Sequence, residues 1–120
     1  MPIPTDYREV VDSLVMKTRE GDLAWKKEKF ALGLTIDKSK FSIWAGNDEY
    51  SEEPFVAFGL YESNGAAIDS WFVDQSDTDY FTMNELYKSA NRQALGVPKR
   101  LKALNALISE MKSSDDPAEI

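Results

Sequence analysis

Apolar positions along the chain recur first with the period of a helix, then with that of a strand, and finally with that of a helix again. Between residues 7 and 18 they are spaced three and four apart, which predicts a helix with one apolar face. Asp6 and Glu9 stand as a variant of a capping box at its start. Gly21 stands where a left-handed residue would end it. The first segment is therefore expected to be a helix.

From residue 23 to residue 74 the pattern changes, and apolar residues alternate with polar ones. This period of two is typical of strands. A turn is expected at residues 37–40, and a polar, acidic loop at residues 46–54. The segment therefore predicts four or five short strands that follow one another along the chain.

The dipeptide Asn64-Gly65 lies between two apolar runs and predicts a hairpin. Both residues tolerate the positive φ that a two-residue type I′ turn requires. With such a turn, Tyr61 pairs with Ile68 and Phe58 pairs with Trp71. Large apolar side chains then lie on both faces, so we expect this hairpin to be central in the sheet or covered on both sides.

The helical period returns in the last third of the chain. Residues 82–85 have the pattern of a capping box, with Phe81 and Leu86 as the hydrophobic staple around it. Gly96 is expected to end this helix, because glycine is favoured just after a helix C-terminus. Apolar positions between residues 97 and 111 predict one more helix.

This order of elements predicts an α+β fold: an N-terminal helix, an antiparallel meander of four to five strands, and two C-terminal helices packed on the sheet. Residues 1–112 are expected to form a single domain, and residues 113–120 a frayed acidic tail. At 120 residues, the chain is long enough to bury a core without a metal or disulfide staple.

The net charge of −7 is spread unevenly along the chain. Residues 1–85 contain 8 basic and 17 acidic side chains, a balance of −9. Residues 86–112 contain 6 basic side chains and one acidic side chain, a balance of +5, and residues 113–120 add −3. An acidic body with a basic helical end can present a binding face, although a lysine-rich solvated helix has the same composition.

The chain contains no cysteine and no histidine. Disulfides, thiolate nucleophiles, zinc-finger ligands and Ser-His-Asp triads are therefore excluded. The opening residues show no signal-peptide pattern, and the longest apolar stretch is too short to span a bilayer. We accordingly expect a cytoplasmic protein without a membrane association. No glycine spacing matches a phosphate-binding loop.

Two groups of carboxylates are candidates for chemistry. Asp74, Asp77 and Asp79 suggest a calcium loop, but position six of that loop would be Asp79 where glycine is required. We therefore interpret these acids as negative charge ahead of a helix N-terminus. Asp69 is the remaining candidate for a carboxylate pair, with Glu62 or Asp48 as its partner. A strand-edge aspartate bonded to backbone or lysine is the simpler interpretation, so we expect no enzyme, no cofactor and no metal.

Residues 90–104 have the outline of a DNA-binding helix-turn-helix, with a tight turn at Gly96. In such units a small residue stands four positions before the turn glycine, and a buried hydrophobe stands in the second helix. Here Arg92 and Lys102 occupy these positions. The apolar residues Leu101 and Leu104 instead favour an ordinary αα-hairpin packed on the sheet.

Two motifs resemble small bacterial or phage-borne proteins of uncharacterised function. They are Lys17-Thr18-x-x-Gly21-x-Leu23-x-Trp25 and Leu86-Tyr87-x-x-Ala90-x-Arg92-x-Ala94-Leu95-Gly96-Val97. The resemblance extends over about residues 14–107. It implies that this part of the chain folds as one unit, and it implies no activity.

The sequence therefore favours a non-enzymatic protein–protein interaction or accessory module. A second copy of the chain, docking its basic end on the acidic body, is one partner that the charges suit. Nucleic-acid binding by the basic C-terminal helical hairpin is the alternative. The candidate binding patch consists of Lys88, Arg92, Lys99, Arg100 and Lys102.

Overall fold

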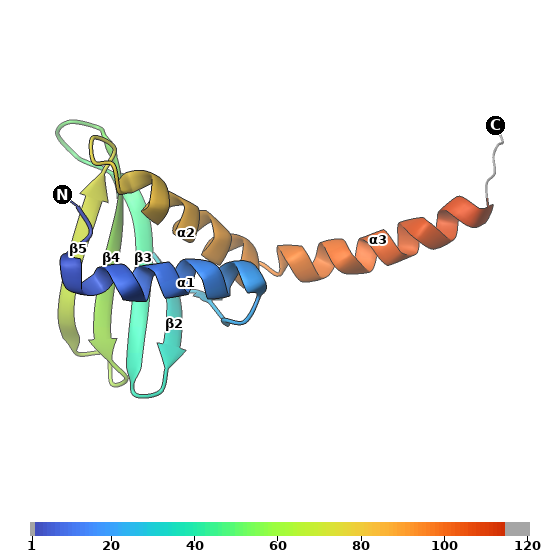
Figure 1. Ribbon diagram of the computed structural model, residues 1–120, viewed down its shortest axis with the longest axis horizontal. Coiled ribbons are helices and arrows are strands. Elements are labelled where there is room, and N and C mark those ends of the chain that lie inside the picture. Colours follow the sequence, from blue (N-terminus) through green and yellow to red (C-terminus); the bar gives the residue numbers. More distant parts are fainter. Residues whose placement is uncertain (1, 115–120) are drawn as a thin grey trace.

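The computed structural model describes residues 2–114, and its helices and strands follow the expected order (Figure 1). A short 3-10 turn and a helix lead into five antiparallel strands, and two helices follow. This α+β architecture confirms the predicted fold class. The elements are η1 (Thr5–Tyr7), α1 (Arg8–Glu20), β1 (Lys26–Lys27), β2 (Leu32–Ile36), β3 (Ser39–Asn47), β4 (Pro54–Glu62), β5 (Ala67–Asp74), α2 (Tyr80–Ala94) and α3 (Val97–Ser114).

The sheet is a simple meander with the strand order β1-β2-β3-β4-β5, so that β5 is an edge strand. Helices α1 and α2 lie together over the same face of this sheet (Figure 1). The expectation that the β4–β5 hairpin is central or covered on both sides is therefore wrong. One strand of this hairpin is an edge, and its second face carries no helix within residues 2–114.

The hydrophobic core lies between this sheet face and the two helices. Alternate residues of β2–β5 face the helices, as the period of two requires, and the buried stripes of α1 and α2 pack on them. The fully buried side chains of this core are Val11, Leu32, Ile43, Val56, Phe58, Val73, Met83, Leu86 and Ala90.

The β4–β5 turn differs from the prediction by one residue. The loop closes over residues 63–65, three residues rather than two, and its glycine alone among them has a positive φ, of 96°. A three-residue loop of this kind introduces a bulge. Tyr61 consequently pairs with Ala67, and Ile68 becomes the extra residue. Beyond the bulge the register is the predicted one.

The two predicted capping boxes are not formed. Tyr7 rather than Asp6 stands at the N-cap of α1, because a 3-10 turn precedes this helix, and it makes no side-chain capping bond. Helix α2 begins at Tyr80, which places Thr82 inside its first turn. The predicted staple is absent as well, since Phe81 is 72% exposed.

Trp25 joins both helices to the start of the sheet. Its indole N–H donates a 2.9 Å hydrogen bond to the hydroxyl of Thr18, in the last turns of α1. Its backbone N–H donates to the side-chain oxygen of Gln93, near the end of α2, at 3.0 Å. Gly21 ends α1 in the left-handed conformation, with a φ of 80°, as predicted. Thr18 and Trp25 are both buried.

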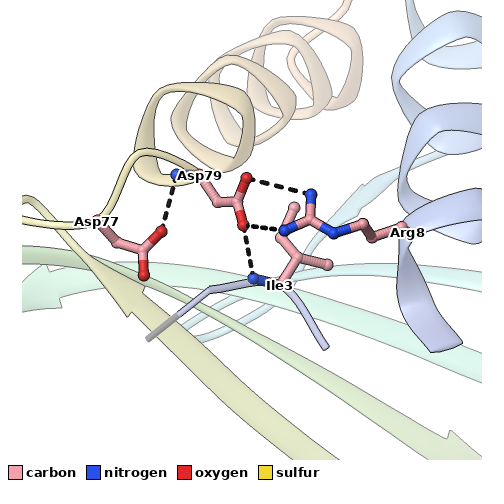
Figure 2. A network of polar contacts seen from close by, with 4 residues as sticks. All are labelled: Ile3, Arg8, Asp77 and Asp79. Carbon is pink, nitrogen blue, oxygen red and sulfur yellow. Dashed lines mark hydrogen bonds and ion pairs between the residues drawn. The ribbon is translucent and has the colours of Figure 1, made fainter. Parts of the chain in front are cut away.

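Asp79 joins the N-terminal segment to the start of α2 (Figure 2). Its carboxylate accepts hydrogen bonds from the Arg8 guanidinium, at 2.6 and 3.2 Å, and from the backbone N–H of Ile3, at 2.8 Å. The Arg8 hydrogen bond is the main cause that lowers the pKa of Asp79, and the Ile3 hydrogen bond adds to it. Asp77 in turn accepts the backbone N–H of Asp79 at 2.8 Å. Asp77 and Asp79 thus hold the N-terminal segment and the start of α2 in place.

We expect Thr18→Val to lower the free energy of unfolding by about 1–3 kcal/mol, because the buried indole N–H of Trp25 loses its acceptor while the side-chain volume is kept. Urea unfolding measures this loss. The matched control Thr35→Val, at an exposed strand position, is expected to stay within about 0.5 kcal/mol of the wild type. Equal stabilities for the two variants would contradict the assigned hydrogen bond.

We expect Asp79→Asn to destabilise the protein by about 1 kcal/mol at neutral pH, since Arg8 is half exposed and its ion pair is partly screened by solvent. A lowered carboxyl pKa stabilises the fold above the unfolded pKa of about 4 and loses this contribution as the pH falls through the folded pKa. The difference from the wild type should therefore shrink in urea titrations below about pH 4. Asp22→Asn, which removes a 3.9 Å exposed pair, is the control. A pH-independent difference would contradict this account.

Candidate functional site

Helix α3 projects away from the body formed by the sheet, α1 and α2 (Figure 1). Among the described elements it contacts α2 alone, at the turn that contains Gly96. The Cα radius of gyration is 18.4 Å, compared with about 14 Å for a compact domain of this length. The expected αα-hairpin packed on the sheet is therefore corrected: α2 packs there and α3 does not.

The physical reason is visible in the core. Helices α1 and α2 cover the apolar residues of one sheet face, and no described residue of α3 belongs to the core that they form. The left-handed Gly96, with a φ of 72°, then directs α3 outward. Periodicity alone predicts that α3 has an apolar face, and it does not tell whether this face is covered.

The apolar face of α3 is exposed. Leu101, Leu104 and Ile108 are 53%, 45% and 59% exposed, and they stand at positions i, i+3 and i+7, which place them on one side of a helix. We call Leu101, Leu104, Leu107 and Ile108 the apolar stripe. At about 100° per residue, Arg100 lies at the edge of this stripe, and Lys99 and Lys102 lie on the opposite side.

All five residues of the predicted basic patch are exposed. The structure brings two of them together: Arg92 and Lys99 line one cleft of about 550 Å³ at the junction of α2 and α3. We call it the junction cleft. Glu20 lines the same cleft, so that its charge is mixed. The patch is therefore divided, because Lys88, Arg100 and Lys102 lie outside this cleft.

A second hollow, of about 550 Å³, lies along the seam between α1 and α2. Its apolar lining includes Met16 and Phe81, which are 56% and 72% exposed. We call this hollow the seam groove. It adjoins the junction cleft, since Arg19 and Glu20 line both. Three carboxylates stand around the apolar pair, those of Asp12, Glu20 and Glu85.

The seam groove is not predicted by the sequence patterns. These patterns assign Phe81 to a staple, and Met16 falls outside the apolar stripe expected for the first helix. A signal is nevertheless present, since both are large apolar residues at helix positions that do not face the core.

The uncovered face of the sheet carries a third hollow, of about 510 Å³. Trp44, Phe55 and Phe72 line it, and the rings of Phe55 and Phe72 meet edge to face with centroids 6.0 Å apart. Asp48 is the one charged residue in its lining. The lining of this hollow is thus mainly aromatic.

The candidate carboxylate Asp69 is not paired with Glu62 or Asp48. It accepts a 2.9 Å hydrogen bond from the hydroxyl of Tyr7 and a 3.0 Å bond from the backbone N–H of Ser70. Burial, reinforced by the hydrogen bond to Asp69, raises the pKa of Tyr7 to about 12. Asp69 therefore holds the N-terminal segment on the edge strand.

Comparisons with profiles of known protein families, with curated proteins and with solved structures find no match. Over residues 2–114, no helix combines the length and the apolar character needed to cross a membrane. In the same range, no group of three or more acidic, histidine or cysteine side chains is arranged to hold a metal ion.

We expect the double variant Leu104→Glu/Ile108→Glu to unfold within about 0.5 kcal/mol of the wild type in dilute solution, because these side chains lie outside the core and glutamate suits a helix as well as leucine does. Leu86→Ala, in the core, should instead cost about 2–5 kcal/mol. Urea unfolding at low protein concentration measures both. A similar loss in the two variants would show that α3 packs on its own body.

Proposed function

We propose that the chain is a non-enzymatic protein-interaction module that binds its partner through the apolar stripe of α3. The observation that carries this proposal is the exposure of Leu101, Leu104 and Ile108 on a helix that contacts α2 alone among the described elements. Apolar anchors spaced i, i+3 and i+7 are the pattern with which a helix enters a hydrophobic groove of a partner.

The free energy gained by burying the apolar stripe favours a binding role for α3. Each large aliphatic side chain that leaves water on docking contributes about 1.5–3 kcal/mol, while the fold gains little from these residues as they stand. A helix whose apolar face is exposed is also an aggregation hazard for a free chain. A partner that covers the stripe removes this hazard.

Nucleic-acid binding is the second candidate, because Arg92 and Lys99 share one cleft. With Arg19, three basic side chains line this cleft, and they would neutralise phosphates together. Glu20 in the same cleft and the −9 balance of residues 1–85 oppose a polyanion. The apolar stripe also has no role in a phosphate interface, so we favour a protein partner.

The test compares three forms of the full chain as bait in a lysate of the source organism and as purified samples in light scattering. The forms are the wild type, Leu104→Glu/Ile108→Glu, and the control Ala106→Glu/Ser109→Glu, which adds the same charge on the opposite side of α3. We expect the wild type and the control to associate, either with a captured protein that rebinds when purified or with themselves. The stripe variant should lose at least about tenfold in affinity.

Association that the stripe variant retains would contradict the proposal, and so would its absence from all three forms in both assays. The same samples, titrated with duplex and single-stranded oligonucleotides over a salt series, test the second candidate. Binding that weakens steeply with salt, survives in the stripe variant and is lost in Arg92→Ala/Lys99→Ala would assign nucleic acid instead.

A further inference from the structure

The seam groove and the apolar stripe are complementary in chemistry. The groove offers exposed Met16 and Phe81 between carboxylates, and the stripe offers aliphatic side chains with a guanidinium at its edge. Charged groups of opposite sign at the rim favour such an encounter and fix its register. Within the described chain, nothing occupies the groove, because α3 points away from it.

We infer that the partner of α3 is a second copy of this chain, and that each copy inserts its apolar stripe into the seam groove of the other. This inference rests on the proposed function, in which α3 is the docking element. Every copy has one projecting helix and one groove, so a reciprocal exchange closes as a symmetric dimer and leaves neither surface exposed.

The lengths of the two surfaces agree. The apolar stripe from Leu101 to Ile108 is about 11 Å long, and the wall of the groove from Asp12 to Glu20 is about 12 Å long, at about 1.5 Å per residue. One docked helix is a small interface. Two such contacts in each dimer double the buried area, and they bring it toward the roughly 1,600 Å² that is typical of stable complexes.

Charge distinguishes the possible docking sites of α3 on a second copy of the chain. Among the charged residues with described side chains, α3 carries Lys99, Arg100 and Lys102 against Glu110. Pairing the stripe of α3 with the stripe of another α3 would bring the two Arg100 guanidinium groups to the same interface, which opposes association. The seam groove has three carboxylates against one guanidinium, whereas the hollow on the open sheet face has Asp48 alone. The groove is thus the surface with the stronger opposite charge.

The groove also lies next to the root of α3. Arg19 and Glu20 line both the seam groove and the junction cleft, and that cleft includes Gly96 and Lys99. A helix lying along the seam of its neighbour therefore meets the neighbour's own α2–α3 junction at one end.

Sedimentation equilibrium of the full chain, over a wide range of micromolar concentrations, tests the inference. We expect a reversible dimer for the wild type. Leu104→Glu/Ile108→Glu removes the stripe, and Met16→Glu/Phe81→Glu removes the apolar floor of the groove. Each should raise the dissociation constant of the dimer at least about tenfold.

The control variant is Phe30→Glu, which should dimerise as the wild type does. Phe30 is 83% exposed but lies outside the groove. Circular dichroism confirms that each variant is folded.

A mixing experiment separates this arrangement from every other one. The stripe variant keeps an intact groove, and the groove variant keeps an intact stripe. An equimolar mixture should therefore form a heterodimer through one helix-in-groove contact, more weakly than the wild type, which has two contacts, but more strongly than either variant alone. A groove variant that stays fully dimeric would show that α3 pairs elsewhere, and a mixture that stays monomeric would remove the groove as the site of α3. Either result overturns the inference.

Different results would contradict this inference and the proposed function. A wild-type chain that stays monomeric at every concentration overturns self-association. If the same chain still captures another protein through Leu104 and Ile108, the proposed function stands. If α3 mediates neither association, both fail.

Discussion

The contacts of Trp25 determine how the rest of the molecule is arranged. The buried indole is bonded to Thr18 of α1, and the backbone N–H of the same residue is bonded to Gln93 of α2. A buried hydrogen-bonding group costs free energy unless it is satisfied, so both helices are held at one end of the sheet. Gln93 lies in the last turn of α2, three residues before Gly96, so this bond anchors the end of the body from which α3 leaves.

This arrangement separates stability from binding along the chain. Residues up to the end of α2 supply the core, which lies under α1 and α2 on one face of the sheet. Helix α3 contributes almost nothing to that core, and its apolar face is available to another molecule. The charge is also asymmetric, because residues 1–85 have a balance of −9 and residues 86–112, which contain most of α2 and of α3, have a balance of +5. A helix and a body of opposite charge are suited to meet between copies.

Local patterns in the sequence predict the elements, and their failures have local causes. Alternation identifies the strands, and Gly21 and Gly65 mark real positive-φ positions. The turn around Gly65 is nevertheless one residue longer than predicted. The sequence does not reveal this difference, because a bulge at Ile68 is not distinguishable in sequence from a shift of register. Thr82 has the sequence pattern of an N-cap, whereas Asp79 holds the start of the helix by a tertiary bond to Arg8.

The candidate site is predictable only in part, for a related reason. The basic residues and the apolar period of α3 are properties of a single segment, and the sequence displays both. Whether that apolar face is covered depends on how α1 and α2 fill the sheet face, and this is a property of the whole fold. The seam groove likewise forms only when Met16 and Phe81, far apart in the sequence, are brought to one surface.

The central claim is that α3 projects from its own body, and an intrachain distance tests it most directly. The chain has no cysteine, so spin labels attached at Ser13→Cys in α1 and Ser109→Cys in α3 report on this pair alone. The labelled chain is diluted into an excess of unlabelled protein, which leaves only the distance within one copy. Pulsed electron resonance should then give a long distance, as expected for a helix that leaves the body. A short distance, typical of two packed helices about 10 Å apart, would show that α3 folds back on its own chain and would contradict the account.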